Sequence, residues 1–324
     1  MSKRVFIDGS AGTTGLRIRE RLSSRVDIEL VVLPDELRKD VAARREALNS
    51  SAVAFLCLPD AAAVEAVALV ESHDTVVIDT STAHRTADGW EYGFPELAGR
   101  RERIAGAKRI ANPGCHASGF IALVEPLVHA GLIARDSKLC AFSLTGYSGG
   151  GKKMIADYET QLREPSGGAG NPPRPLSANP YLGGRQYALG QSHKHLPEMA
   201  KICGLSAAPC FSPIVVPHLS GMEVTVQLHG VDLDAIRECY RACYGEGRGG
   251  MVRFADDPAA AEGGFLSSAA FSGRDDMEVS VHGSAERALL VSRFDNLGKG
   301  ASGAAIQNMN LVLGCAEDEG LVKG

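Results

Sequence analysis

The chain has 324 residues, of which 44% are hydrophobic and 23% are charged, and its formal net charge is −5. This composition indicates a folded globular protein long enough for two domains, and it excludes a disordered chain. The net charge argues against a nucleic-acid partner, because no basic stripe is present to neutralise phosphates. No apolar segment reaches the roughly 20 residues of a spanning helix, so we predict no membrane contact and a cytoplasmic location.

The eight cysteines form no CxxC pair, and a chain of this size does not need a disulfide framework. We therefore predict reduced thiols. Cys239 and Cys243 lie one helical turn apart, but no nearby histidine or cysteine completes a set of zinc ligands. The sequence therefore predicts no metal site.

The chain opens with a short apolar strand over residues 4–8, then a glycine-rich turn, then a helix-like segment over residues 16–22. The glycines are three residues apart, which lets the backbone tighten and approach a diphosphate at a helix N-terminus. Their GxxGxxG spacing differs from the commoner GxGxxG. We predict that a dinucleotide is bound by Gly9, Ser10, Ala11, Gly12, Thr13, Thr14 and Gly15.

Buried strands are predicted over residues 28–33, 53–58 and 75–79, with a helical stretch over residues 61–71 between two of them. This alternation predicts an α/β domain with a Rossmann-like, doubly wound parallel sheet. Ligands bind at the carboxyl ends of such strands. At these ends we place three further cofactor-binding residues, Leu58, Pro59 and Ser81.

The usual clue to the cofactor's ribose is an acidic residue at the end of the second strand. Asp35 and Glu36 lie slightly beyond that strand and favour NAD, whereas the nearby Arg38 favours NADP. This stretch therefore leaves the choice between the two cofactors open.

Cys115 is the main candidate nucleophile. The turn Asn112-Pro113-Gly114-Cys115 joins a strand-like run over residues 109–111 to a helix-like run over residues 117–130. At a helix N-terminus, unpaired amides and the helix dipole favour the thiolate over the thiol. The alternative is a buried structural cysteine.

A second candidate group is the segment from His193 to Glu198. Pro197 favours a helix start there, so Glu198 falls in the first turn and His195 lies just before it. A carboxylate that binds one imidazole nitrogen fixes the tautomer and makes the ring a better base. We therefore predict a Cys–His couple with Glu198 as orienting group, and we favour His195 over His193 as the acid and base.

Two segments offer positive charge or close backbone approach to a ligand. Arg85 follows the strand at 75–79 and suits a phosphate or carboxylate. Lys152 follows the glycine run that includes Gly149 and Gly150, which suits an anion or the nicotinamide end of a cofactor. The full P-loop spacing is absent, which argues against ATP. We predict that substrate is bound by Arg85, Asn112 and Lys152.

Beyond Cys115 the pattern changes to strands at 139–147, 214–229, 277–282 and 287–293, which predicts an α+β domain with a mixed or antiparallel sheet. The Pro- and Gly-rich stretch 164–185 is too long for a simple turn and is interpreted as a lid or a subunit-contact arm, or as a loop without function. Small and apolar residues over 296–313 predict a closing helix between the two domains.

Four motifs in this order resemble N-acetyl-gamma-glutamyl-phosphate reductases, members of the semialdehyde dehydrogenase superfamily, and specifically the shorter of the family's two classes. They are YGFPEL at 92–97, NPGC at 112–115, HKHLPE at 193–198 and the glycine-rich closing helix at 295–310. Aspartate-semialdehyde dehydrogenases share the glycine turn and the capped cysteine, but the combination with YGFPEL and HKHLPE is specific.

The resemblance implies the reduction of N-acetylglutamyl phosphate by NADPH to N-acetylglutamate semialdehyde and phosphate, a step of arginine biosynthesis, through a thioester on Cys115. NAD is not excluded as the cofactor, and no metal is implied. The histidine would keep the cysteine ionised and move the proton. Because the closing helix returns to the cofactor domain in this family, Asn296 and Lys299 are expected near the nicotinamide, with Asn296 as a cofactor-binding residue.

The resemblance also implies a homo-oligomer, either a dimer or a tetramer. The NADP-binding Rossmann domain is expected over residues 1–114, completed by the helix at 296–324, and the catalytic domain over residues 115–295. Three alternatives stay open. One is another acyl-phosphate reductase such as an aspartate-semialdehyde dehydrogenase, another is a phosphorylating aldehyde dehydrogenase running oxidatively, and the third is a cofactor-binding sensor without catalysis.

Overall fold

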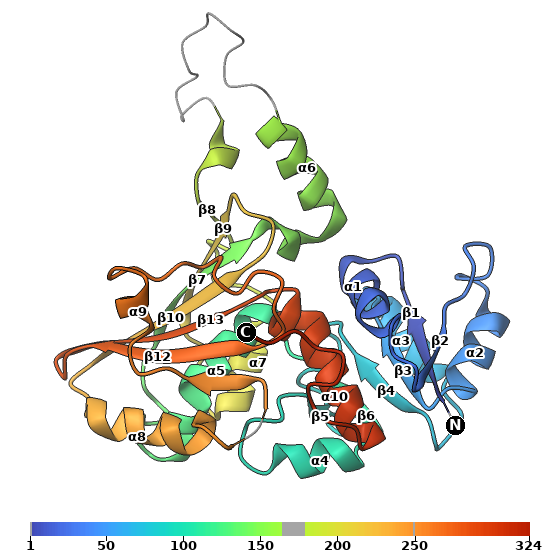
Figure 1. The fold of residues 1–324 in the computed structure, drawn as a ribbon, viewed down its shortest axis with the longest axis horizontal. Helices are drawn as coiled ribbons and strands as arrows, with labels where there is room; N and C mark the ends of the chain where they lie inside the picture. Colours follow the sequence, from blue (N-terminus) through green and yellow to red (C-terminus); the bar gives the residue numbers. More distant parts are fainter. Residues whose placement is uncertain (1, 164–178, 249) are drawn as a thin grey trace, which may run out of the picture.

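The computed structural model describes residues 2–163, 179–248 and 250–324, and it contains two β-sheets joined through helices (Figure 1). The N-terminal sheet lies on the right of Figure 1 and the second sheet on the left. Most of the predicted lid or subunit arm, residues 164–178, lies outside the described residues.

The first sheet is entirely parallel, with strand order β2-β1-β3-β4-β6-β5. This arrangement confirms the Rossmann-like, doubly wound sheet. Each strand is short because its apolar run is short and ends at glycine, proline or a polar residue. The strands are β1 (Lys3–Asp8), β2 (Ile28–Val31), β3 (Val53–Leu56), β4 (Val76–Asp79), β5 (Glu91–Tyr92) and β6 (Arg109–Ala111).

Helices cover both faces of this sheet, as apolar residues on both sides of each strand require. On one face, Ile18, Ile104 and Ile306 from three helices pack against strand residues such as Ile7 and Phe55. The opposite face packs against the other two helices. The first group is α1 (Thr13–Leu22), α4 (Arg100–Gly106) and α10 (Gly303–Leu313), and the second is α2 (Val41–Asn49) and α3 (Asp60–Ala68).

The first helix begins at Thr13, three residues earlier than the sequence predicts, so the last glycine of the turn lies inside α1. A side chain on Gly15 would place its Cβ 2.6 Å from the Gly9 carbonyl oxygen. The close packing of the turn against the helix therefore requires glycine there. It keeps the amides at the start of α1 close to the ends of the strands.

The second sheet has seven strands in the order β11-β12-β13-β10-β7-β9-β8 and mixes parallel with antiparallel pairs. It confirms the predicted α+β domain, although 214–229 contains the end of one strand and all of the next. The strands are β7 (Cys140–Gly146), β8 (Arg185–Gln186), β9 (Cys210–Val216), β10 (Met222–His229), β11 (Val252–Phe254), β12 (Met277–Gly283) and β13 (Arg287–Phe294).

One face of the second sheet packs against helices. Phe120 and Leu123 of the first of these helices contact the inward side chains of β10 and β13, such as Val224 and Leu290. The opposite face leaves Phe142 and other apolar side chains exposed. The helices in this half are α5 (Cys115–His129), α6 (Gly151–Arg163), α7 (Leu196–Cys203), α8 (Leu233–Tyr244) and α9 (Pro258–Ala261).

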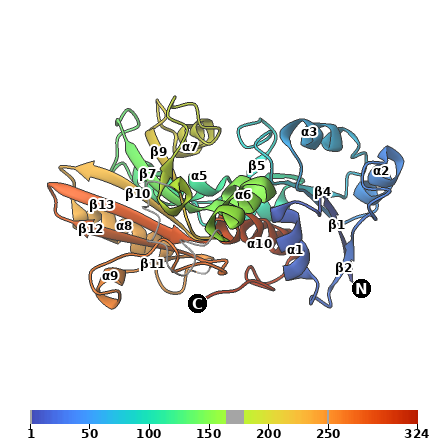
Figure 2. The same ribbon diagram turned by 90° about the horizontal axis from the view of Figure 1, so that it is seen from above.

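The closing segment is not one uniform helix. A π-helical turn spans Gly298–Ser302, and α10 follows it. A side chain on Gly298 would meet the Arg274 carbonyl oxygen at 1.9 Å, and one on Gly303 would meet Asp275 Oδ1 at 2.8 Å, so both glycines allow a close approach. Figure 2 shows α10 between the two sheets, where it completes the core of the first.

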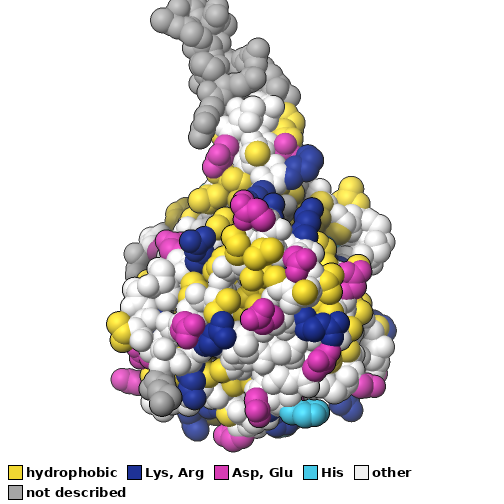
Figure 3. Space-filling model, turned by 90° about the vertical axis from the view of Figure 1, so that its right-hand side faces the viewer, with side chains coloured by type: hydrophobic (Ala, Val, Ile, Leu, Met, Phe, Trp, Pro, Cys, Tyr) yellow, Lys and Arg dark blue, Asp and Glu magenta, His cyan; other side chains and the backbone are white. Residues whose placement is uncertain are grey.

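The face on the right-hand side of Figure 1 carries acidic and basic side chains intermingled with apolar ones (Figure 3). Among the described residues, no helix is long and apolar enough to cross a lipid bilayer. The cytoplasmic location stays a prediction, as do the boundaries proposed for the two domains.

Candidate active site

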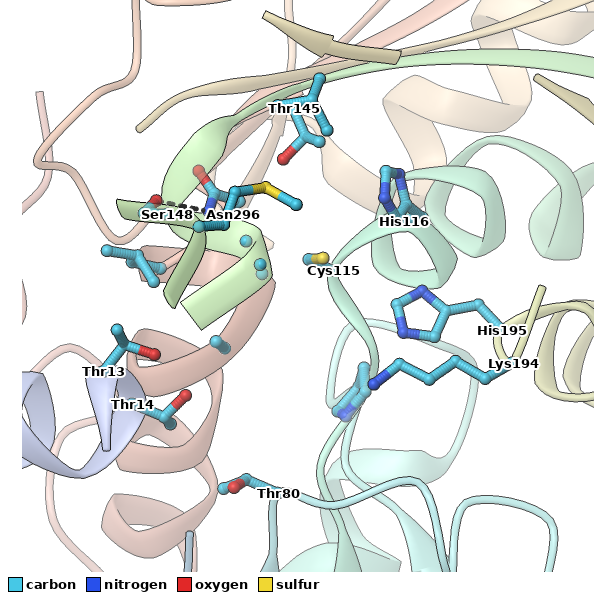
Figure 4. A pocket seen from close by; sticks show the side chains of 18 of the residues that line it. Thr13, Thr14, Thr80, Cys115, His116, Thr145, Ser148, Lys194, His195 and Asn296 are labelled. Carbon is cyan, nitrogen blue, oxygen red and sulfur yellow. Dashed lines mark hydrogen bonds between the residues drawn. The ribbon is translucent and has the colours of Figure 1, made fainter. Parts of the chain in front are cut away.

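Cys115 is the first residue of α5, directly after the extended Gly114, as the sequence predicts. It lies at the wall of a cavity of about 290 Å³ between the two sheets. Behind it, a side chain on Gly300 would approach the Cys115 Cβ to 3.0 Å. The π-helical turn thus supports the cysteine from one side, and the thiol faces the cavity (Figure 4).

Three cavities follow one another along the carboxyl edge of the first sheet. The one at Cys115 shares Thr13, Thr14 and Thr80 with a second cavity over the start of α1. The second shares Gly12 and Leu58 with a third, which reaches the end of β2. Together they form a continuous path from the expected ribose end of a dinucleotide to the nucleophile.

The glycine turn fits a diphosphate. Gly9 has φ +85°, and a side chain there would meet the Cys57 carbonyl oxygen at 2.3 Å, so the backbone occupies space that only glycine leaves free. Gly12 caps α1 and directs the free amides of its first turn outward. The predicted cofactor-binding residues that line these cavities are Gly9, Ser10, Ala11, Gly12, Thr13, Thr14, Gly15, Leu58, Pro59 and Ser81.

The third cavity, at the expected ribose end, is lined by cations and by the carboxylate of Asp8. Asp35 is exposed and pairs with Arg38, and neither Asp35 nor Glu36 lines the third cavity. That cavity is lined instead by Arg38, Lys39 and Arg44, with Arg44 bound to Asp8.

Glu198 lies beside His195, as predicted, but its hydrogen bonds go to other groups. Its Oε1 accepts a hydrogen bond from Arg85 Nη1 at 2.9 Å, whereas His195 Nε2 lies 3.9 Å away. Its Oε2 accepts from the Tyr92 hydroxyl at 3.0 Å and from the Gly114 amide at 3.2 Å. Glu198 therefore fixes the turn before Cys115 and neutralises Arg85. It faces the histidine without a hydrogen bond because a guanidinium outcompetes a neutral imidazole for a buried carboxylate.

The histidines form a neutral cluster at the cavity. Burial lowers the pKa of His193 to about 4, with a further decrease from the charges of Lys194 and Arg85. Burial also lowers the pKa of His195 far below its usual value, and Arg85 adds to this decrease. The His193 Nδ1 accepts the His195 amide at 3.1 Å. Both rings are therefore neutral at pH 7 and can each accept a proton.

Burial also favours the neutral form of the Cys115 thiol. Burial raises its pKa, and the charges of Arg85 and Lys194 and the His116 amide offset this only in part. Burial thus opposes the ionisation expected from the helix N-terminus and a histidine, and the ionised cysteine stays a prediction. The thiol requires a base at the moment of attack, and Figure 4 shows the His195 ring extending toward it.

Two other predicted residues, Asn112 and Asn296, have side chains that hydrogen-bond to the protein itself. The Asn112 side chain donates to the Ala301 carbonyl and accepts from Asn308, while it lines the cavity. Asn296 binds the Ser148 hydroxyl at 2.9 Å (Figure 4) and the Gly221 amide at 3.0 Å, which fixes the loop that carries Gly149 and Gly150. Both glycines line the cavity, as does Asn296.

Two predicted lysines lie elsewhere. Lys152 is exposed on α6 and lines none of the three cavities. Lys299 is not beside the cavity, because its ammonium is buried and binds both oxygens of Glu96 at 2.8 Å. The local sequence could not show where these two side chains point, because both lysines lie beside glycines in helix-forming segments.

Three titratable residues that line the cavity were not predicted from the sequence: His116, Tyr187 and Lys194. His116 Nε2 lies 2.7 Å from the Tyr187 hydroxyl, and its Nδ1 lies 2.7 Å from the Ser143 hydroxyl. Lys194 lines both the first and the second cavity. Two signals were available: His116 directly follows the nucleophile, and Lys194 lies between the two candidate histidines.

The fold and the site together define a semialdehyde dehydrogenase. Residues 4–107 match the family described as semialdehyde dehydrogenase, NAD binding domain, and residues 115–296 match its dimerisation domain. Solved aspartate-semialdehyde dehydrogenases share the fold. One from Vibrio cholerae has a TM-score of 0.70 at 17% identity, covering 97% of this chain and 98% of that one. One from Candida albicans has a TM-score of 0.61 at 14% identity, covering 98% of this chain and 99% of that one.

Within this class, the chain belongs to the N-acetyl-gamma-glutamyl-phosphate reductase family. It is 43% identical to N-acetyl-gamma-glutamyl-phosphate reductase 2 of a Nostoc species, over 98% of this chain and 99% of that protein. It is 43% identical to the Burkholderia ambifaria reductase over 96% of both. The Mesorhizobium japonicum reductase is 41% identical over 97% of this chain and 100% of its own length. These similarities confirm the family indicated by the motifs.

Proposed function

We propose that this protein reduces N-acetylglutamyl 5-phosphate to N-acetylglutamate 5-semialdehyde and phosphate, a step of arginine biosynthesis, with NADPH as reductant. The observation that carries the proposal is the placement of Cys115 at the start of α5, in a cavity continuous with the dinucleotide turn. The identity of 41–43% over nearly the full length to reductases of this name supports the substrate.

The reaction begins with the neutral thiol and a neutral histidine. As the Cys115 Sγ attacks the acyl carbon, His195 takes its proton, the carbon–oxygen bond to phosphate breaks, and a thioester forms. When bound, NADPH supplies the hydride that reduces the thioester carbon. The thiohemiacetal on Cys115 then collapses to the aldehyde, and the sulfur regains a proton from the histidine.

The other residues hold this arrangement. Glu198 binds the Gly114 amide and Arg85, which fixes the turn that presents the thiol. The glycine turn and the start of α1 are suited to the diphosphate of the cofactor. We favour NADPH over NADH because Arg38 and Lys39 line the cavity where the ribose phosphate would lie. We also propose a dimer or tetramer, consistent with the match to a dimerisation domain.

The test is the reverse reaction, followed as reduction of NADP or NAD with phosphate and either N-acetylglutamate semialdehyde or aspartate semialdehyde. We expect phosphate-dependent turnover of the N-acetylated substrate with NADP, and none with Cys115→Ser. Turnover of aspartate semialdehyde alone would support the proposed mechanism but would refute the proposed N-acetylated substrate. Cofactor binding without any turnover would instead indicate a sensor.

A further inference from the structure

Two described cations face the nucleophile, and they differ in how freely they can bind an anionic ligand. Of the described residues that line the cavity at Cys115, Arg85 and Lys194 are the cations. Arg85 is buried, and its donors bind Glu198 Oε1 at 2.9 Å, the Asn112 carbonyl at 3.0 Å and the Thr80 carbonyl at 3.1 Å. Its charge is compensated by Glu198, so little of it is available to an anionic ligand.

The charge of Lys194, unlike that of Arg85, is not compensated by a described carboxylate. Within the described parts of the chain, no hydrogen bond or ion pair engages its ammonium. Its side chain is exposed and reaches into the cavity from beside His195 (Figure 4). Its charge is close enough to lower the pKa of Cys115 and of His193. An unpaired cation therefore lies within electrostatic reach of the nucleophile.

We propose that Lys194 binds the phosphoryl group of the acyl phosphate, and inorganic phosphate in the reverse direction. This proposal rests on the proposed function. A phosphoryl group carries a charge of about −2 at neutral pH, and lysine binds phosphate as a point charge. When the Cys115 sulfur bonds to the acyl carbon, the departing oxygen keeps the electron pair of the broken bond. A nearby ammonium stabilises that growing negative charge.

A cofactor diphosphate is the other phosphate that Lys194 could meet, because Lys194 also lines the cavity over the start of α1. The substrate is favoured by position. The neighbours of Lys194 in the chain are His193 and His195, and all three line the cavity that contains Cys115. The free amides of α1 already provide for the diphosphate.

The experiment compares the wild type with Lys194→Met, Lys194→Arg and the control Lys138→Met. Lys138 is an exposed lysine that lines none of the three cavities. In the protein without cofactor, inorganic phosphate is titrated as a protectant of Cys115 against iodoacetamide. The KM for phosphate in the reverse reaction and the Kd for NADPH, from its fluorescence, are measured alongside.

For Lys194→Met we expect the protecting phosphate concentration and the KM for phosphate to rise together by about 10- to 100-fold, as loss of one charge-assisted contact implies. The Kd for NADPH stays unchanged. Lys194→Arg recovers most of the loss, and Lys138→Met behaves as wild type.

A weaker NADPH affinity with unchanged phosphate protection would overturn the proposal in favour of the cofactor. Unchanged values for both would overturn it outright. The protection assay needs no turnover, so it distinguishes this proposal from the proposed function. If phosphate protects the wild type but the protein reduces no substrate, the proposed function is refuted and the proposed phosphate site at Lys194 is still supported.

Discussion

Glu198 and Arg85 form a buried ion pair, although 113 positions separate them in the chain: Oε1 accepts from Nη1 at 2.9 Å. The carboxylate also accepts the Gly114 amide, and the guanidinium also binds the Asn112 carbonyl, so the pair holds both ends of the turn before Cys115. The glutamate therefore acts on the nucleophile through the backbone.

Glu198→Gln should destabilise the protein by about 3 kcal/mol, because it leaves the buried Arg85 without its counter-ion. Urea unfolding followed by circular dichroism measures this. The control is Tyr92→Phe, which removes one hydrogen bond to the same carboxylate and should cost about 1.5 kcal/mol. If Glu198→Gln lowers the free energy of unfolding no more than Tyr92→Phe does, the ion pair with Arg85 does not stabilise the protein as expected.

Gly114→Ala should reduce turnover severely. The new Cβ would lie 2.3 Å from Arg85 Nη1 and 2.5 Å from both Glu198 Oε1 and His195 Nε2, so three groups of the site must move. The expected cost in unfolding free energy is about 1–3 kcal/mol. Gly106→Ala is the matched control, since its Cβ would meet nothing within 4 Å. Normal kcat/KM in Gly114→Ala would show that the site tolerates displacement of these groups.

The pH profile of kcat/KM should lack the acid limb of an ordinary histidine. The base must be neutral, and burial lowers the pKa of His195 and brings that of His193 from 6.5 to about 4. Activity should therefore persist below pH 6 and fall only as the pH approaches these lowered values. His195→Asn should lose about 10²- to 10⁴-fold in kcat, and His193→Asn less. An acid limb with its midpoint near 6.5 would refute the neutral cluster.

Glu96→Gln should cost about 3–5 kcal/mol at pH 7, because it strands the buried ammonium of Lys299. Burial alone would raise the pKa of Glu96, but Lys299 and Gln307 hold it below its usual value of 4.5. A lowered folded-state pKa stabilises the protein above the unfolded value, and the contribution disappears as the pH falls through the folded value. The difference from wild type in urea unfolding should therefore shrink in acid.

Glu65→Gln is the control for that substitution. Glu65 is an exposed glutamate on α3, where loss of charge should change stability by less than about 0.5 kcal/mol. A pH-independent difference between Glu96→Gln and wild type would mean that the effect comes from packing rather than from the ion pair.

Local patterns predicted much of the fold and part of the site. The glycine turn and the start of α5 at Cys115 follow from interactions within a few residues, so the sequence shows them directly. Contacts between distant segments were not predictable in the same way. Glu198 lies one turn from His195, which suggested a pair, yet the stronger partner, Arg85, comes from the loop after β4 of the first sheet.

The positions of the lysine side chains were likewise not predictable from local sequence. Lys152, Lys194 and Lys299 are alike in type and all lie near motifs, but one is exposed on α6, one faces the cavity and one is buried against Glu96. The direction of a long side chain depends on packing between segments far apart in sequence. Burial likewise raises the pKa of Cys115, an effect that the position at a helix N-terminus does not show.

The most direct test of the account is intact-protein mass spectrometry after incubation with N-acetylglutamyl phosphate in the absence of NADPH. The account predicts one N-acetylglutamyl group per chain, attached through a thioester to Cys115, released by hydroxylamine and absent from Cys115→Ser. An adduct on another residue, or substrate reduction by Cys115→Ser at the wild-type rate, would contradict it.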